Sequence, residues 1–248
     1  LITNRLLDLG VEPKQAKEAL AYITNASQLR DLPLILAQAL YVSLVPAVSE
    51  SMAVGNAEQA RHRAATAMRL TWLIGLPCTV GLVVAARDAY GVLFTGPGWY
   101  VMAPLGWSTV FLMLQQTSSG ILQGLGLIWL SVVNQLTGVV VKVILTYWWT
   151  GIPSLQENGA AYATVVGFLI AAGLNLRAVR RHFSLTVNFR ENIYRPLLAS
   201  LLMGLILYLV SPVSQALIPW HRLAGLATVS VGGLVYGVAI LALGGVRE

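Results

Sequence analysis

The sequence contains a long uncharged run. The 53 residues from Ala89 to Val141 include no Asp, Glu, Lys or Arg. About 20 apolar residues in a helix suffice to cross the hydrocarbon core of a bilayer. The composition agrees, since 56% of the 248 residues are hydrophobic and only 10% are charged, whereas roughly 25% of the residues in a soluble domain are charged. The sequence therefore predicts an integral membrane protein.

Seven uncharged or nearly uncharged segments are long enough to span a bilayer. They cover residues 32–49, 70–86, 101–123, 127–149, 158–176, 196–213 and 223–244. A transmembrane β-barrel would instead show segments of ~10 residues in which apolar and polar side chains alternate. That alternation is absent from the sequence. The predicted fold is all-α, a polytopic transmembrane bundle of seven helices.

The start of the first span has two interpretations. Either the span begins near residue 32, or the helix begins as early as Gln15, carries Arg30 and Asp31 into the membrane and kinks at Pro33. Adjacent side chains point about 100° apart on a helix, so we expect Arg30 and Asp31 not to pair. In a solvated cavity the arginine could bind phosphate oxygens with its fork of donors, whereas at the interface it would only mark the membrane boundary.

Basic residues are distributed unequally between the two ends of the predicted spans. If the spans alternate in direction, six basic residues lie on one side and nine on the other, namely Arg61, Arg63, Arg69, Arg177, Arg180, Arg181, Arg190, Arg195 and Arg247. Cytoplasmic loops are enriched in Lys and Arg, so we expect the C-terminus in the cytoplasm. Nucleic acid is not an expected partner, because the net charge of +6 does not gather on one amphipathic face.

Two adjacent spans carry stripes of polar side chains, each about 80° wide at 100° per residue. The stripes consist of Ser131, Asn134, Gly138 and Lys142 in the fourth span and Ser108, Gln115, Ser119 and Gln123 in the third. Polar side chains are costly in lipid and usually face a bundle interior or a water-filled cavity, so one interpretation is a polar wall that lines a substrate cavity. In the alternative interpretation Lys142 snorkels to the headgroups and the amides form ordinary hydrogen bonds between helices.

Small residues recur at every fourth position in the fifth span, as Gly159, Ala163, Gly167 and Ala171. Such a stripe lets the backbone of another helix approach closely, so we expect it to be a packing face. Shorter versions of the pattern are Gly120 with Gly124 and Gly233 with Gly237.

Motifs for catalysis or metal binding are absent from the sequence, which has a single cysteine and three scattered histidines. Asp88 and Glu157 lie in predicted outer connections and could in principle serve a glycosyltransferase that acts on polyprenol-linked sugars. Nothing else in the sequence supports an enzyme. The chain begins with Leu1 and without the pattern of a signal peptide, so we expect it to be a piece of a longer protein.

Five regions combine Gly, Pro and polar residues in patterns more specific than hydrophobicity alone. They are SLVPAVSE at 43–50, RLTWLIGLP at 69–77, LQQTSSGILQGLG at 114–126, GIP at 151–153 followed by NGAA at 158–161, and LNLR at 174–177. Together they resemble the stage V sporulation protein B and polysaccharide-export branch of the multidrug/oligosaccharidyl-lipid/polysaccharide flippase superfamily. The resemblance extends over nearly the whole chain.

The resemblance implies the C-terminal half of a fourteen-helix transporter of the bacterial plasma membrane. Residues 1–181 would form helices of the C-terminal lobe, residues 182–248 would add two further helices, and the N-terminal lobe would be missing. The implied substrate is a polyprenyl-diphosphate-linked saccharide, a precursor of peptidoglycan or another polysaccharide, which crosses the membrane by alternating access. In relatives the last two helices form a groove for the lipid tail, so membrane lipids and this substrate are the expected partners.

Two other functions compete with this interpretation. A multidrug exporter of the same superfamily, driven by Na⁺ or H⁺, would need a carboxylate in the membrane, and only Asp31 could provide it here. A non-transporting membrane scaffold would have no use for a buried polar wall. We expect no cofactor, no metal and no catalytic residue, and the candidate cavity residues are Arg30, Asp31, Gln115, Ser119, Gln123, Asn134 and Lys142.

Overall fold

The computed structural model describes residues 2–183, 193–218 and 220–244, and these residues form helices and turns without a strand. The helices are α1 (Ile2–Asp8), α2 (Pro13–Asp31), α3 (Leu34–Ala53), α4 (Ala57–Val84), α5 (Ala86–Leu93), α6 (Trp99–Gly106), α7 (Ser108–Gly124), α8 (Ile128–Thr150), α9 (Gln156–Phe183), α10 (Arg195–Leu217) and α11 (His221–Ala242). Six of them, α3, α4 and α8 to α11, are long and apolar enough to cross a membrane. The predicted all-α fold is confirmed.

The remaining predicted span, residues 101–123, falls on two helices instead of one. Helix α6 ends at Gly106 and α7 begins at Ser108, with Trp107 between them at φ −59° and ψ −25°. The Ser108 hydroxyl donates a hydrogen bond of 2.6 Å to the carbonyl of Leu105. Such a side-chain bond competes with the helical backbone ladder. Six continuous helices and one interrupted helix are thus broadly consistent with the predicted seven spans.

The first predicted span begins close to the expected residue 32, because α3, a helix long and apolar enough to cross a membrane, starts at Leu34. Helix α2 runs up to Asp31, Pro33 follows at φ −63° and ψ −21°, and α3 continues from Leu34. Proline has no amide hydrogen and its ring crowds the preceding turn, so the helical hydrogen bonds are interrupted here. The structure thus has features of both interpretations: the membrane-length helix begins beside residue 32, and a further helix, α2, precedes it with a break at Pro33.

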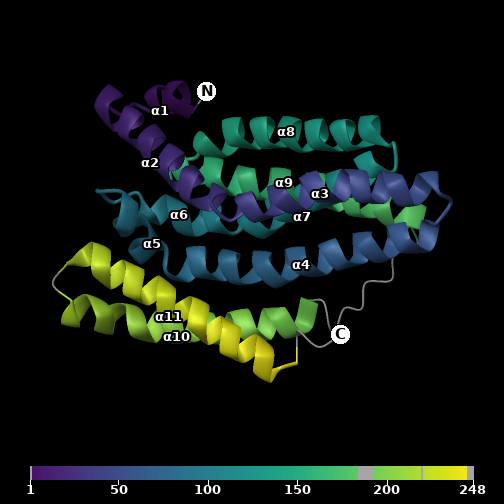
Figure 1. The fold of residues 1–248 in the computed structure, drawn as a ribbon. Helices are drawn as coiled ribbons and strands as arrows, with labels where there is room; N and C mark the ends of the chain where they lie inside the picture. Colours follow the sequence, from purple (N-terminus) through teal and green to yellow (C-terminus); the bar gives the residue numbers. More distant parts are fainter. Residues whose placement is uncertain (1, 184–192, 219, 245–248) are drawn as a thin grey trace.

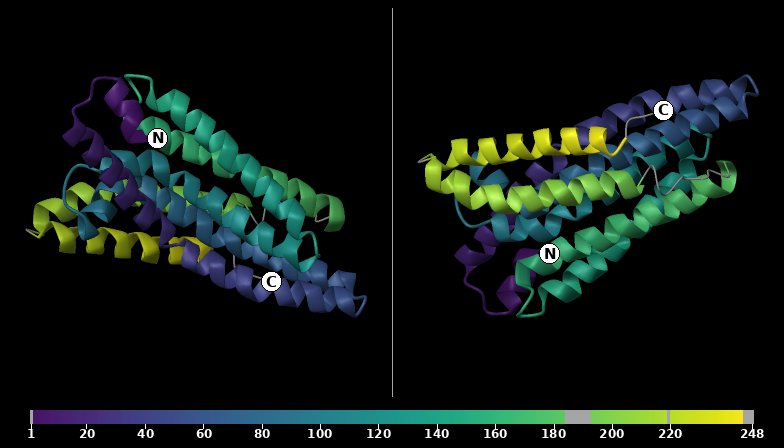
Figure 2. Two further views of the ribbon diagram at one scale, coloured as in Figure 1. Left: turned by 90° about the horizontal axis from the view of Figure 1, so that it is seen from above. Right: turned by 90° about the horizontal axis from the view of Figure 1, so that it is seen from below.

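The helices are arranged around α7, which is buried along most of its length. Helices α3 and α4 pack against α7, as does α9, whose other partner is α8. Helices α10 and α11 form a second hairpin, which packs on α4 and α5. The α8–α9 and α10–α11 hairpins lie on opposite sides of α4 and α7 (Figure 1), and the long helices run roughly along one direction in both views of Figure 2.

Two turns between antiparallel helices use glycine in the left-handed region. Gly55, between α3 and α4, has a φ of +72°, and Gly126, between α7 and α8, has a φ of +77°. Residues with a β-carbon rarely adopt this conformation. After the first turn, the Asn56 side chain caps α4 by accepting a 2.9 Å hydrogen bond from the Gln59 amide. The local sequence therefore defines where these helices end and begin.

The small-residue stripe of α9 is a packing face, as predicted, and the helix that packs on it is α8. A β-carbon placed on Gly167 would lie 2.7 Å from the β-carbon of Lys142 and 2.8 Å from the carbonyl oxygen of Gly138. One placed on Gly159 would lie 2.6 Å from the backbone of Trp149. No real side chain fits at these distances, so the two backbones are in contact.

The shorter glycine pairs have different outcomes. Gly120 and Gly124 approach Tyr41 and Val48 of α3, as the packing pattern predicts. The prediction for Gly233 and Gly237 is wrong, because a β-carbon on either would meet no atom within 4 Å. On α11 the neighbouring Gly232 makes the close approach instead, toward Leu207 of α10.

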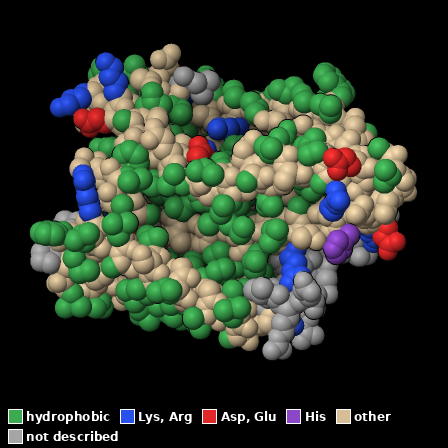
Figure 3. Space-filling model, viewed as in Figure 1, with side chains coloured by type: hydrophobic (Ala, Val, Ile, Leu, Met, Phe, Trp, Pro, Cys, Tyr) green, Lys and Arg blue, Asp and Glu red, His purple; other side chains and the backbone are tan. Residues whose placement is uncertain are grey.

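The outer surface of the hairpins is apolar. Large hydrophobic side chains are exposed along α8, α10 and α11, among them Val140, Trp148, Leu205, Tyr208, Leu234 and Val238. Figure 3 shows hydrophobic side chains over most of one face, while Lys, Arg, Asp and Glu lie mainly toward the ends of the helices. A surface of this kind requires lipid as its solvent, which fits a multi-pass membrane protein. Two of the basic residues used to predict orientation, Arg190 and Arg247, lie outside the described residues.

Candidate functional site: a charged cluster beside an apolar cavity

The end of α2 carries an ion pair between neighbouring residues. The Nε and Nη2 groups of Arg30 donate hydrogen bonds of 2.9 and 2.7 Å to the same oxygen of Asp31, Oδ1. The expectation that these two side chains would not pair is wrong. Asp31 is the last residue of α2, and the long arginine side chain folds back over the helix end to reach its neighbour.

Phe168 of α9 brings a third charged residue to this pair. The guanidinium carbon of Arg30 and the ammonium nitrogen of Lys142 each lie 5.6 Å from the centre of the Phe168 ring. Cations over an aromatic face are attracted by its negative charge density. Arg30, Asp31 and Lys142, which the sequence proposed from two separate spans, therefore lie in one cluster around this ring. We refer to these three residues and Phe168 as the charged cluster.

The backbone under Lys142 is held by the close contact between α8 and α9. Gly167, the residue before Phe168, leaves the space in which the first side-chain carbon of Lys142 lies. The lysine side chain therefore leaves the α8–α9 contact and extends along α9 to the ring. Its ammonium group lies over the same ring as the guanidinium of Arg30, so two cations and one carboxylate share this part of the fold.

Four other polar residues meet between α7, α8 and α9, in what we call the amide network: Gln115, Ser119, Asn134 and Asn175. The Asn175 side chain accepts a 2.9 Å hydrogen bond from Asn134 Nδ2 and donates one of 2.9 Å to Ser119 Oγ. Gln115 donates to the same serine at 3.3 Å. All four residues are buried. Gln115, Ser119 and Asn134 therefore lie in the interhelical hydrogen bonds that the alternative interpretation of the polar stripes expects.

Asn175 is the central residue of this network and was not among the predicted site residues. A sequence signal for it existed, because it lies four residues after Ala171 and continues the small-residue stripe of α9. The last predicted residue of the wall, Gln123, lies elsewhere: its Oε1 accepts a 2.6 Å hydrogen bond from the Tyr41 hydroxyl of α3. The structure thus separates the residues of the predicted wall. Lys142 lies in the charged cluster, Gln123 lies beside Tyr41, and the amide network contains Gln115, Ser119 and Asn134.

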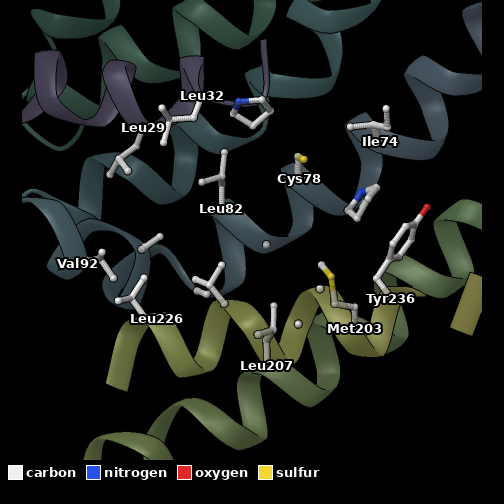
Figure 4. A pocket seen from close by; sticks show the side chains of 18 of the residues that line it. Leu29, Leu32, Ile74, Cys78, Leu82, Val92, Met203, Leu207, Leu226 and Tyr236 are labelled. Atoms are coloured by element: carbon white, nitrogen blue, oxygen red, sulfur yellow. The ribbon is translucent and has the colours of Figure 1, made fainter. Parts of the chain in front are cut away.

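An apolar cavity of about 680 Å³ lies between α4, α5, α10, α11 and the end of α2. Figure 4 shows Leu29 and Leu32 on one side of this cavity and Leu207 on the other. The cavity contains one hydroxyl group, that of Tyr236, which donates a 2.6 Å hydrogen bond to the carbonyl of Leu73. The space is therefore suited to hydrocarbon.

The bend between α2 and α3 borders both the apolar cavity and the charged cluster. Leu29 and Leu32, which line the cavity, stand directly before and after Arg30 and Asp31 in the sequence. A single turn of helix thus presents leucine to the cavity and charge to Phe168. At 100° per residue the two leucines lie on the opposite face of the helix from Arg30 and Asp31, so the cavity and the charged cluster lie on different sides of the bend.

Two carboxylates considered for enzymatic chemistry are each bound to a different neighbour. Asp88 Oδ1 accepts a 2.6 Å hydrogen bond from Gln215 of α10, and Glu157 Oε1 accepts one of 2.5 Å from the Tyr100 hydroxyl of α6. Within the described ranges there is no group of three or more His, Cys, Asp or Glu residues that could hold a metal ion.

The fold is shared with two solved structures of helical membrane proteins. A structure titled "Lipid II flippase MurJ, inward closed conformation" superposes on 89% of this chain and 46% of its own, with a TM-score of 0.71 at 17% identity. A second, an inward-facing MATE family multidrug resistance transporter of the MOP superfamily, covers 89% of this chain and 57% of its own, with a TM-score of 0.55 at 16% identity. At these identities the likeness is one of fold.

The family is defined by sequence, since the model of the family Lipid II flippase MurJ matches residues 14–228. The chain belongs to this family. Stage V sporulation protein B of Bacillus subtilis (strain 168) is 30% identical over 198 residues, which are 77% of this chain and 37% of that protein. Lipid II flippase MurJ of the same organism is 24% identical over 241 residues, 89% of this chain and 43% of that protein. The chain thus spans less than half the length of these relatives.

Proposed function

We propose that this chain is part of a flippase that moves a polyprenyl-diphosphate-linked saccharide from the inner to the outer leaflet. The observation that supports this most directly is that the α2–α3 bend borders both a charged cluster and an apolar cavity. A lipid-linked diphosphate has the matching division into an anionic head and a hydrocarbon tail. Membership of a flippase family supports the same function.

Within the charged cluster the two cations have different roles. The guanidinium group of Arg30 presents paired donors that match two oxygens of a phosphate, whereas the Lys142 ammonium acts as a point charge. The tail would lie in the apolar cavity, along α10 and α11. Family members move their substrates by rocking two lobes around a central site, and we infer that a lobe equivalent to the other half of the relatives supplies the remaining contacts.

The competing functions receive less support from this geometry. A cation-coupled exporter needs a membrane carboxylate that is free to bind Na⁺ or H⁺, and the candidate, Asp31, already binds Arg30. A scaffold would bear the cost of two cations within a membrane protein without a ligand for them. The division of the chain at residue 181 into lobe and additional helices stays part of the proposal.

The test is a flipping assay with the full-length protein in proteoliposomes, using an undecaprenyl-diphosphate saccharide with a fluorescent headgroup. Lys142→Gln removes the charge and should lower the flipping rate at least about tenfold, the loss expected for a charge contact worth about 1.4 kcal/mol. Lys142→Arg keeps the charge and should retain more activity. Lys17→Gln, an exposed lysine of α2, is the matched control and should behave as wild type.

The measurement needs folded protein of every variant, judged by yield and elution from size-exclusion chromatography. Normal flipping by Lys142→Gln would contradict the role of this lysine. Loss of flipping in Lys17→Gln as well would mean that the assay responds to total charge and not to the cluster.

Orientation in the membrane is part of the proposal, with the C-terminus in the cytoplasm. In a Cys78→Ala background, Val54→Cys in the α3–α4 turn should react with an impermeant maleimide only from the cytoplasmic side. Thr95→Cys, before α6, should react only from outside. Both positions are exposed, so the reagent can reach them. Labelling of both cysteines from the same side would overturn the assigned topology.

A further inference from the structure

Asp31 has no place in the proposed substrate contacts, yet it lies directly on the group that would bind the phosphate. We propose that the Asp31 carboxylate occupies the anion site on Arg30 when no substrate is bound. The substrate diphosphate displaces this carboxylate when it binds, and the return of the carboxylate promotes release of the substrate. This inference rests on the proposed function and adds a positioning residue to it.

The first argument is the geometry of the pair. The Nε and Nη2 groups form the edge of a guanidinium that binds a phosphate through two parallel hydrogen bonds. In Arg30 both groups donate to one oxygen, Asp31 Oδ1. Among the described residues none donates to the other oxygen, so the pair lacks the two-oxygen geometry of a strong arginine–carboxylate contact. A phosphate would therefore compete for this edge with better geometry.

The second argument is exposure. The Arg30 side chain is 9% exposed, whereas that of Asp31 is 47% exposed. The carboxylate is thus the more accessible partner of the pair. Ion pairs with a half-exposed partner contribute little to stability, so displacement is not costly.

The third argument is the position of Asp31 in α2, where a carboxylate is unfavourable for the helix. Asp31 is the last helical residue, and the unpaired carbonyl groups at that end repel negative charge. Helix stability therefore does not account for an aspartate at this position. Lys142 lies close by on the Phe168 ring, so the cluster has two cations and one anion. A diphosphate that replaced Asp31 on Arg30 would be adjacent to both cations.

Most substitutions in a binding site weaken the binding of its ligand, whereas removal of the Asp31 charge should strengthen it. Asp31→Asn removes the charge that competes for the Arg30 guanidinium and should tighten the binding of a diphosphate on the order of tenfold. Release should slow in parallel, so the flipping rate at saturating substrate should fall while KM also falls. A variant that merely disturbed the fold would weaken binding instead.

The test measures the binding of farnesyl diphosphate to the full-length protein in detergent by isothermal titration calorimetry, with farnesol as the uncharged probe. The matched control is Asp8→Asn, because Asp8 is also an exposed aspartate that pairs with an arginine, Arg5, at 3.6 Å. Asp31→Glu keeps the charge and should bind as wild type within about twofold. Tighter binding in Asp31→Asn, absent in Asp8→Asn and absent for farnesol, is the expected result.

The outcomes separate this inference from the proposed function. If Arg30→Gln and Lys142→Gln leave the binding of farnesyl diphosphate unchanged, the anion site itself is refuted, and the displacement fails with it. If those variants weaken binding but Asp31→Asn binds no tighter than Asp8→Asn, only the displacement by substrate is refuted. Equal tightening in Asp31→Asn and Asp8→Asn would show an effect of net charge and would also overturn it.

Discussion

Asn134 and Lys142 lie on the same face of α8, eight residues apart, and have opposite surroundings. Asn134 is buried and its side chain donates to Asn175, within the amide network. Lys142 is half-buried, and in the described part of the chain no acceptor receives a hydrogen bond from its ammonium group. Within about two turns, one polar stripe of a membrane helix therefore changes from hydrogen bonding between helices to a charged group over an aromatic ring.

The energies of the two regions differ accordingly. A hydrogen bond between membrane helices contributes roughly 0.6 kcal/mol, so the amide network adds modest stability and fixes how α7, α8 and α9 meet. A cation within the membrane is instead a cost that a protein bears where it binds something. We therefore interpret the amide network as a packing element and keep the charged cluster as the proposed ligand site.

The largest expected effect comes from the close contact between α8 and α9, which supports both the amide network and the charged cluster. Gly167→Leu places a branched side chain where α8 and α9 touch, 2.7 Å from the Lys142 β-carbon. Overpacking costs about 1–3 kcal/mol even where side chains can adjust, and here backbone blocks the adjustment. We expect most of the folded protein to be lost in detergent, measured as the monodisperse peak in size-exclusion chromatography.

A matched control for this variant exists on the same helix. Gly173 is exposed, and a β-carbon at this position would meet no atom within 4 Å. Gly173→Leu should therefore give a wild-type yield. Equal yields from the two leucine variants would contradict the close contact and would remove the common support of the amide network and the charged cluster.

The fold could be predicted from the sequence because membrane helices obey a simple length rule. The uncharged segments correspond to real helices, and the stripe from Gly159 to Ala171 is a packing face as expected. The breaks at Pro33 and Trp107 were harder, since a proline shows where a helix can bend but not whether the chain continues beyond it. The helix before Pro33 therefore stayed one of two interpretations.

The site could be predicted only in part, because side-chain partners depend on three-dimensional neighbours. The sequence selected Arg30, Asp31 and Lys142 as costly charges, but helical angles alone excluded the pair that Arg30 and Asp31 form. Phe168 gave no signal, since an aromatic residue in a membrane helix usually faces lipid or core. Its role depends on α2 and α9 lying together, which no local pattern encodes.

A smaller effect should follow from breaking the amide network. Asn175→Ala removes the hydrogen bonds to Asn134, Ser119 and the carbonyl of Gln115. At roughly 0.6 kcal/mol each, the free energy of unfolding should fall by about 2 kcal/mol, seen as a lower Tm in detergent. Thr137→Ala is the control, because the exposed Thr137 hydroxyl bonds only to its own helix, at Val133.

The flipping rate per folded molecule should stay normal in Asn175→Ala. A strong loss of transport at unchanged Tm would contradict the interpretation of the amide network as a packing element. The amide network would then belong to the transport pathway, as the original interpretation of the polar wall holds.

The smallest expected effect concerns the aromatic ring of the charged cluster. Phe168→Leu keeps an apolar side chain but removes the attraction for Arg30 and Lys142, each contact worth about 0.5–1 kcal/mol when partly exposed. The two cations would then lose the attraction that holds them at the ring and would be less well positioned for a diphosphate. We expect a KM for flipping about three- to fivefold higher, which corresponds to about 1 kcal/mol.

Phe168→Tyr keeps the aromatic face and should leave KM unchanged. Tyr147→Leu is the control, because it removes a similar contact outside the cluster, that of Arg5 with the Tyr147 ring at 4.6 Å. This variant tests whether the loss of any contact between a cation and an aromatic ring raises KM. An unchanged KM in Phe168→Leu would mean that the ring only fills space. A raised KM in both leucine variants would assign the effect to general stability, and the distinction between the amide network and the charged cluster would then rest on Lys142 and Asp31 alone.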